Sequence, residues 1–173
     1  MKKYLYHTPR ARAGFTLLEL LTVITIIAIL SAALMGTMGI VQKNARINLT
    51  KSHLQLLKSA LDRYTGDFDD YPPSDGDGLK GAQSLYSCLT TTKKGGPYLQ
   101  PGDIPTCDAT GNGDTAFADQ WKHPIYYMHH HDYHNQAPNK HDFRLIAPGP
   151  NGIYEDGEKS SDDIVNWNKE KPE

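Results

Sequence analysis

The chain has 173 residues, 38% of them hydrophobic, which is enough for one globular domain and an additional segment. Its formal net charge is −2, but the first fourteen residues hold four basic side chains and no acid, so that their removal leaves a chain near −6. The absence of a basic stripe to neutralise phosphates argues against nucleic acid as the main partner.

The most informative stretch is an apolar run over residues 15–41 that follows a short basic leader, residues 1–14. A run of this length is typical of a membrane-spanning helix. It contains one acid, Glu19, and because a carboxylate is costly in hydrocarbon we expect that acid to be functional. A secretory signal is cleaved after its apolar region. Here the expected cut lies before it, after Gly14, so that the apolar segment is kept.

The apolar run is predicted to be the first half of one long helix, because it contains no proline. Apolar residues continue at helical spacing with basic residues between them, which predicts an amphipathic second half over 42–65 that packs on the head. We expect the helix to end near Tyr64, with Gly66 as its C-cap. Because glycine is a weak helix former, we expect a local loosening over Gly36–Gly39 in an assembled filament.

The remaining residues, 66–173, are predicted to form a small head domain. Helical apolar spacing predicts a short helix over 79–89, and alternating apolar residues predict a strand that begins near Ile125 and a second strand over 142–147. The two strands are expected to pair antiparallel. The fold class is therefore α+β: a long N-terminal helix, membrane-spanning in its first half and amphipathic in its second, packed on a small antiparallel β-sheet head.

Histidines are concentrated in the connection between the two predicted strands: His129, His130, His131 and His134. Consecutive residues of an extended chain point to opposite faces. Only His129 with His131, or His131 with His134 in a turn, is therefore expected to share a metal ion, and the only nearby carboxylate is Asp132. We interpret the segment as a polar hairpin tip, and keep a metal site or a pH-sensitive contact as alternatives.

The two cysteines, Cys88 and Cys107, are not in a CxxC arrangement, which excludes the usual thiol-redox and c-type haem motifs. Outside the cytoplasm they are candidates for one structural disulfide. The alternative is two unrelated small apolar side chains.

Two acidic segments are candidates for cation binding. The stretch 146–164 combines oxygen-bearing side chains with glycines, which suits a hard cation with roughly six to eight oxygen ligands, although the same composition is typical of an exposed acidic loop. The stretch 67–77 lacks the glycine at the sixth position and the terminal glutamate that an EF-hand loop requires, and it is interpreted as a solvated loop. Catalytic motifs are absent from the sequence, and we expect no enzyme.

The segment Gly14-Phe15-Thr16-Leu17-Leu18-Glu19, with its apolar run, resembles the class III signal of type IV pilins and type II secretion pseudopilins. The resemblance implies that a prepilin peptidase cuts after Gly14 and methylates the new N-terminus, Phe15. It also implies that Glu19 meets the N-terminal amine of a neighbouring subunit during filament assembly. Opposite charges from two chains lower each other's cost of burial, which agrees with this role.

The head also resembles the major pseudopilin family of type II secretion systems. The motifs that carry this resemblance are Tyr71-Pro72-Pro73, Gly78-Leu79, Asp119-Gln120-Trp121-Lys122-His123-Pro124, Gly149-Pro150-Asn151-Gly152, Asp162-Asp163-Ile164 and Asn166-Trp167. It implies a pilin-like fold and a calcium ion bound in the C-terminal loop, 146–164. The candidate side-chain ligands are Asn151, Asp156, Asp162 and Asp163, with a carbonyl near Ile146 or Ile164. The family often has aspartate where this chain has Asn151.

The function that these resemblances imply is that of a structural subunit, which polymerises with copies of itself into a pseudopilus that serves type II protein secretion. The alternative is a major or minor type IV pilin acting in adhesion, motility or DNA uptake. Expected partners are the prepilin peptidase, an inner-membrane assembly platform, minor pseudopilins and the membrane, but no nucleic acid. The expected location is the bacterial inner membrane, crossed once, with the head in the periplasm or another extracytoplasmic space.

Overall fold

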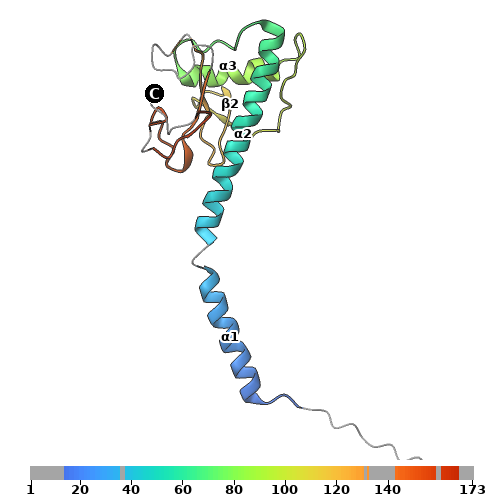
Figure 1. Ribbon diagram of the computed structural model, residues 1–173, viewed down its shortest axis with the longest axis vertical. Helices are drawn as coiled ribbons and strands as arrows, with labels where there is room; N and C mark the ends of the chain where they lie inside the picture. Colours follow the sequence, from blue (N-terminus) through green and yellow to red (C-terminus); the bar gives the residue numbers. More distant parts are fainter. Residues whose placement is uncertain (1–13, 36–37, 131, 133–142, 159–160, 168–173) are drawn as a thin grey trace, which may run out of the picture. The chain divides into compact units, whose positions relative to one another are not determined.

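The computed structural model describes residues 14–35, 38–130, 132, 143–158 and 161–167 (Figure 1). The chain divides into two compact units, Met1–Val41 and Gln42–Glu173. The first contains the apolar run, 15–41, and the second contains the head.

The apolar run forms helix α1, Leu17–Met35, and the next helix, α2, begins at Met38. Among the helices in the part of the chain that the structure describes, none reaches the length and apolarity required to cross a membrane. The prediction of one unbroken helix with a loosening over Gly36–Gly39 depends on residues 36 and 37, which lie outside the described residues, whereas Gly39 is helical.

Helix α2, Met38–Phe68, runs further than predicted. The expected C-cap, Gly66, lies inside the helix, and the left-handed residue that follows its end is Asp69, with φ 61°. The last turn is held by packing, because the rings of Tyr64 and Phe68 stack at 4.3 Å and the Lys94 ammonium lies 4.0 Å from the centre of the Phe68 ring. These contacts offset the weak helix propensity of glycine.

The core of the head joins the second half of α2 to helix α3, Gly78–Thr90, and to the strands. Leu57 and Leu61 are fully buried on α2, as the helical spacing predicts. Leu85 and Leu89 on α3 belong to the same cluster. The prediction of a short helix over 79–89 is therefore confirmed.

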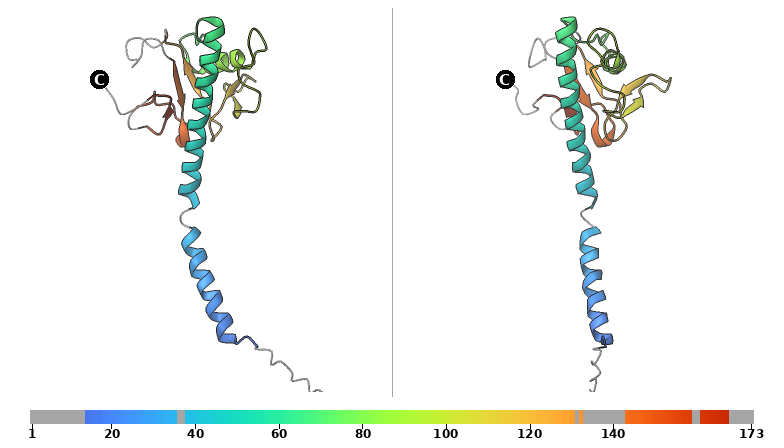
Figure 2. Two further views of the ribbon diagram at one scale, coloured as in Figure 1. Left: turned by 45° about the vertical axis from the view of Figure 1, so that its right-hand side comes forward. Right: turned by 90° about the vertical axis from the view of Figure 1, so that its right-hand side faces the viewer.

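Two small antiparallel sheets complete the head (Figure 2). The three-stranded sheet has the order β3-β4-β5, with bounds Tyr126–Met128, Arg144–Ala147 and Ile164–Val165. The predicted antiparallel pair is confirmed as β3 with β4, in a register that places Tyr127 opposite Leu145. The other sheet is the hairpin of β1, Thr106–Asp108, and β2, Thr115–Phe117. β1, β2 and β5 were missed because, unlike β3, these short segments do not lie in a longer run of alternating apolar residues. The α+β prediction is nevertheless confirmed.

Helix α3 packs on β3 and β2, and one glycine permits the close approach to β3. A Cβ atom added at Gly81 would lie 2.0 Å from the main-chain oxygen of Tyr127 and 2.9 Å from the Cβ of Ser74. The helix starts at the N-cap Asp77, whose side chain accepts a hydrogen bond from the main-chain N–H of Leu79 at 2.8 Å. The cap and the glycine together set where α3 begins and how closely it lies on the sheet.

Candidate functional site

The N-terminal signal residues lie at the start of α1. Thr16 and Glu19 form a reciprocal capping pair, in which the main-chain N–H of Glu19 donates to Thr16 Oγ1 at 3.2 Å and the main-chain N–H of Thr16 donates to Glu19 Oε2 at 3.0 Å. The Thr16 hydroxyl also donates to Oε2, at 2.9 Å. This is a capping box. The sequence pattern Thr-x-x-Glu signals it, but the role of Thr16 was not predicted.

Helix α1 exposes large apolar side chains on every side. Their exposed fractions run from 45% at Val23 to 83% at Leu17, and the set comprises Leu17, Leu18, Leu20, Leu21, Val23, Ile24, Ile26, Ile27, Ile29 and Leu30. Phe15 is also exposed, at 76%. Exposed apolar surface on this scale marks a site of association with a membrane or with other protein chains.

The C-terminal loop is tied together by two carboxylates. It begins with a 3-10 turn, η1, Gly149–Asn151, which Gly152 ends in the left-handed conformation with φ 72°. Asp162 Oδ2 accepts a hydrogen bond from the Asn151 N–H at 3.1 Å. Asp163 Oδ2 accepts from the N–H groups of Glu155 and Gly157, at 3.1 and 2.9 Å. Main-chain donors thus hold both acids against the loop.

The four candidate calcium ligands differ in how their oxygens are used. Asp162 Oδ1 is buried and accepts no hydrogen bond from the described residues, so this atom fits a cation. Asn151 Oδ1 accepts from the Ile153 N–H at 2.7 Å. Asp156 Oδ1 accepts from the Tyr154 hydroxyl at 2.9 Å and lies 3.6 Å from Arg144 Nη1.

The structure therefore brings Asn151 and Asp162 together and turns Asp156 toward Tyr154 and Arg144. Burial, and then the hydrogen bond to Asp156, raise the pKa of the Tyr154 hydroxyl, which keeps it a donor. Within the described part of this loop, no three carboxylates converge on one point. Calcium binding here would need main-chain oxygens as well as side chains.

A turn over 119–123, built on the buried Asp119, supports the C-terminal loop, a role that was not predicted. Asp119 is fully buried, and its Oδ1 accepts from the N–H groups of Trp121 and His123 at 2.8 and 2.9 Å. His123 Nδ1 lies 3.0 Å from the main-chain oxygen of Gly149. Its ring packs so closely on Gly152 that a Cβ there would lie 2.7 Å from Nε2. The motif that contains Asp119 and His123 thus positions the start of the loop.

The acidic stretch 67–77 is more than the solvated loop that was predicted. Besides the N-cap Asp77, Asp67 Oδ2 accepts from the Tyr98 hydroxyl at 2.6 Å, and Asp70 Oδ1 lies 3.0 Å from His129 Nε2. That hydrogen bond, followed by one from the Tyr71 N–H, lowers the pKa of the Asp70 carboxyl.

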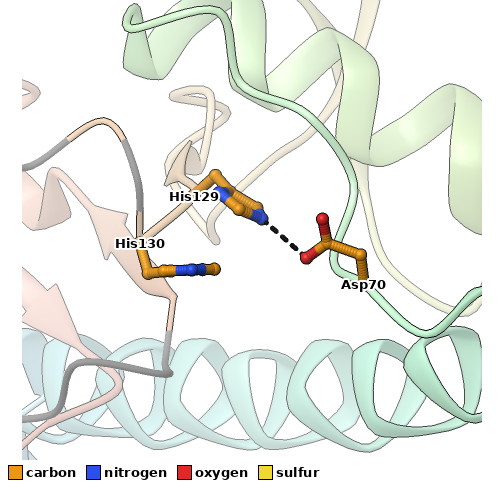
Figure 3. Close-up of side chains that lie close together, drawn as sticks. All are labelled: Asp70, His129 and His130. Atoms are coloured by element: carbon orange, nitrogen blue, oxygen red, sulfur yellow. Dashed lines mark hydrogen bonds and ion pairs between the residues drawn. The ribbon is translucent and has the colours of Figure 1, made fainter.

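The prediction that adjacent histidines point apart is wrong for His129 and His130. Their ring centres are 4.2 Å apart, because β3 ends at Met128 and strand alternation no longer applies beyond it. Asp70 completes a group of three (Figure 3), and no local pattern could have predicted it. His131 and His134 lie outside the described residues.

The candidate disulfide is not formed: Cys88 and Cys107 are both free and half-buried. Cys88 lies on α3 and packs against the main core, whereas Cys107 lies on β1 opposite Ala116. Different neighbours hold the two thiols, which corresponds to the alternative of two separate small side chains. Burial raises the pKa of the Cys107 thiol.

Comparison with known proteins finds relatives that carry the same name. Residues 9–35 match the prokaryotic N-terminal methylation motif. The type II secretion system core protein G of Klebsiella pneumoniae is 30% identical over 156 residues, which cover 89% of this chain and 93% of that protein. The protein of the same name from Escherichia coli K12 is 28% identical over 165 residues, 91% of this chain and 92% of its own.

One solved structure is also similar in part. The crystal structure of the major pseudopilin from the type 2 secretion system of enterohaemorrhagic Escherichia coli aligns with a TM-score of 0.43 at 21% sequence identity. The alignment covers 76% of this chain and 94% of that one.

Proposed function

Since this chain belongs to the family of the type II secretion system core protein G, we propose that it is the structural subunit that polymerises with copies of itself into the pseudopilus of such a system, and that it is not an enzyme. The N-terminal methylation motif and the relatives indicate that it associates with a membrane. The observation that carries the proposal is α1, whose apolar side chains are exposed all round and need a cover of lipid or of neighbouring copies.

Before assembly, the apolar segment 15–41 lies in the bacterial inner membrane, crosses it once and leaves the head in the periplasm. An assembly platform in that membrane and minor pseudopilins then draw the subunit into the filament. Apolar contacts with lipid are exchanged for contacts with neighbouring α1 helices, so little hydrophobic free energy is lost. Small residues favour such close helix packing, and Ser31 and Ala32 occur in α1.

Cleavage after Gly14 by a prepilin peptidase creates the charge that Glu19 requires. Until then Phe15 has a peptide nitrogen, and afterwards it has an amine, which remains basic when methylated. The hydrogen bonds described for the Glu19 carboxylate all reach Oε2. Oε1 is therefore available to accept a hydrogen bond from the Phe15 amine of a neighbouring subunit, and the capping box with Thr16 stays intact.

Production of the full chain in a bacterium with a type II secretion machinery tests this function. We expect mass spectrometry of the membrane fraction to find a chain that begins at methylated Phe15. Electron microscopy should show filaments built from it once it is overproduced. A correctly processed chain that never forms filaments would contradict the proposal.

We also propose that calcium closes the C-terminal loop and stabilises the head. Asp162 Oδ1 supports this, because a buried carboxylate oxygen without a hydrogen bond is costly. Asp163 and the main chain around η1 would supply further oxygens. Asn151 Oδ1 and Asp156 Oδ1 already accept hydrogen bonds from Ile153 and Tyr154, so these two residues are weaker ligands than Asp162.

Calcium at millimolar concentration should raise the melting temperature of the full chain in detergent by several degrees, because it binds the folded state alone. Asp162→Asn should abolish most of this shift. Asp62→Asn, which removes the same charge from an exposed position on α2, should keep it. An equal calcium shift in all three proteins, or none in the unaltered chain, would exclude the ion from this loop.

A further inference from the structure

The cluster of Asp70, His129 and His130 is outside every site that the filament function uses. Each residue offers one ligand atom, and these atoms all lie within 4.8 Å of one another. Figure 3 shows the His129 ring pointing at the Asp70 carboxylate and the His130 ring directed to the same side. The donor set is two imidazoles and one carboxylate, which is a common three-residue set for zinc and related divalent ions.

The spacing of the donors suits one ion. Bonds of about 2.0–2.1 Å in tetrahedral geometry place two ligand atoms of the same zinc about 3.4 Å apart. His129 Nε2 and Asp70 Oδ1 are already 3.0 Å apart, joined by a proton that the metal would replace. The rings of His129 and His130 are tilted by 36° with their centres 4.2 Å apart, and a rotation of His130 about its side-chain bonds would bring its nitrogen to bonding distance from an ion held by the other two residues.

The surroundings hold His129 in place and leave the site open. The Ser74 hydroxyl oxygen accepts the His129 N–H at 2.9 Å, and the same hydroxyl donates to Asp132. The Asp132 N–H in turn donates to the His129 main-chain oxygen at 2.9 Å. Hydrogen bonds from residues outside the ligand set, such as those of Ser74 and Asp132, orient the residues that bind a metal.

The side chain of His129 is 9% exposed, and that of Asp70 is 64% exposed. An ion would therefore enter the site from solvent on the Asp70 side.

An aromatic ring borders the site. Tyr71 packs its ring edge to face with His129, with ring centres 6.4 Å apart, and shields one side of the imidazole from water.

We propose that Asp70, His129 and His130 bind a borderline-soft divalent transition metal, Zn²⁺ or an ion like it, with water as the fourth ligand. The ion links the segment that follows α2 to the segment that follows β3, which are 59 positions apart in the chain. It is a structural link in the head, separate in its residues from the calcium loop. The filament function does not depend on it, and neither proposal fails with the other.

Titration calorimetry of the full chain in detergent with ZnCl₂ tests the site. We expect one tight Zn²⁺ per chain and a melting temperature raised by at least about 5 °C at saturation. Asp70→Asn and His130→Ala should each weaken binding by more than about tenfold, because the loss of a direct ligand exceeds the effect of losing an outer contact. Melting without metal checks that each variant is folded.

Asp69→Asn is the matched control. It removes the same charge one position away, and asparagine tolerates the left-handed conformation of that residue, φ 61°. This variant should bind Zn²⁺ like the unaltered chain. The proposal is overturned if the chain binds no Zn²⁺, if Asp70→Asn leaves the affinity unchanged so that the histidine-rich segment binds the ion alone, or if Asp69→Asn weakens binding equally.

Discussion

Glu19→Ala should leave the chain cleaved and inserted in the membrane but unable to form filaments. Removing the carboxylate leaves each Phe15 amine buried without a counter-charge in the filament. Breaking one side of a buried ion pair costs about 3–5 kcal/mol, and a filament incurs this cost at every subunit. The loss of the capping contact with Thr16 adds only about 1 kcal/mol per helix.

Two further variants separate the charge from the cap. Glu19→Gln keeps the length and a hydrogen-bond acceptor but removes the charge, so it should fail to assemble like Glu19→Ala. Thr16→Ala removes the hydroxyl that bonds Glu19 but keeps the carboxylate, so it should still form filaments. Electron microscopy counts the filaments, and mass spectrometry confirms cleavage after Gly14. Normal filaments from Glu19→Ala would exclude the charge pairing.

Gly81→Ala should destabilise the head by at least about 3 kcal/mol, at the upper end of the cost of overpacking. The new Cβ would lie 2.0 Å from the Tyr127 carbonyl oxygen. This neighbour is main chain within β3, so α3 has to move away from the sheet and Leu85 and Leu89 lose part of their packing. Urea unfolding of the full chain in detergent, followed by circular dichroism, measures the change.

Gly66→Ala is the matched control, because it is the same substitution in a helix with nothing within 4 Å of the added atom. Alanine is a better helix former than glycine by about 1 kcal/mol, so this variant should be slightly more stable. The two substitutions therefore have opposite expected signs. Equal unfolding midpoints for Gly81→Ala and the unaltered chain would show that α3 does not pack on β3 this closely.

Local patterns predicted the elements that are long or strongly periodic. The buried face of α2, the short helix α3 and the antiparallel pairing of β3 with β4 follow from the spacing of apolar residues. The end of α2 was predicted wrongly at Tyr64, because the stacking of Phe68 on Tyr64 outweighs the weak helix propensity of Gly66. The hairpin of β1 and β2 was missed, since neither segment lies in a longer run of alternating apolar residues.

The N-terminal signal is the part of the protein that the sequence alone determines. Gly14, Phe15, Thr16 and Glu19 lie within six consecutive residues at the start of an apolar run, so their chemistry can be read without knowing how the head folds. The groups that only the tertiary structure brings together come from distant segments. Asp70 meets His129 across 59 positions, and the His123 ring meets the Gly149 main-chain oxygen across 26. No local rule encodes such pairs, because packing of the whole core decides which distant side chains meet.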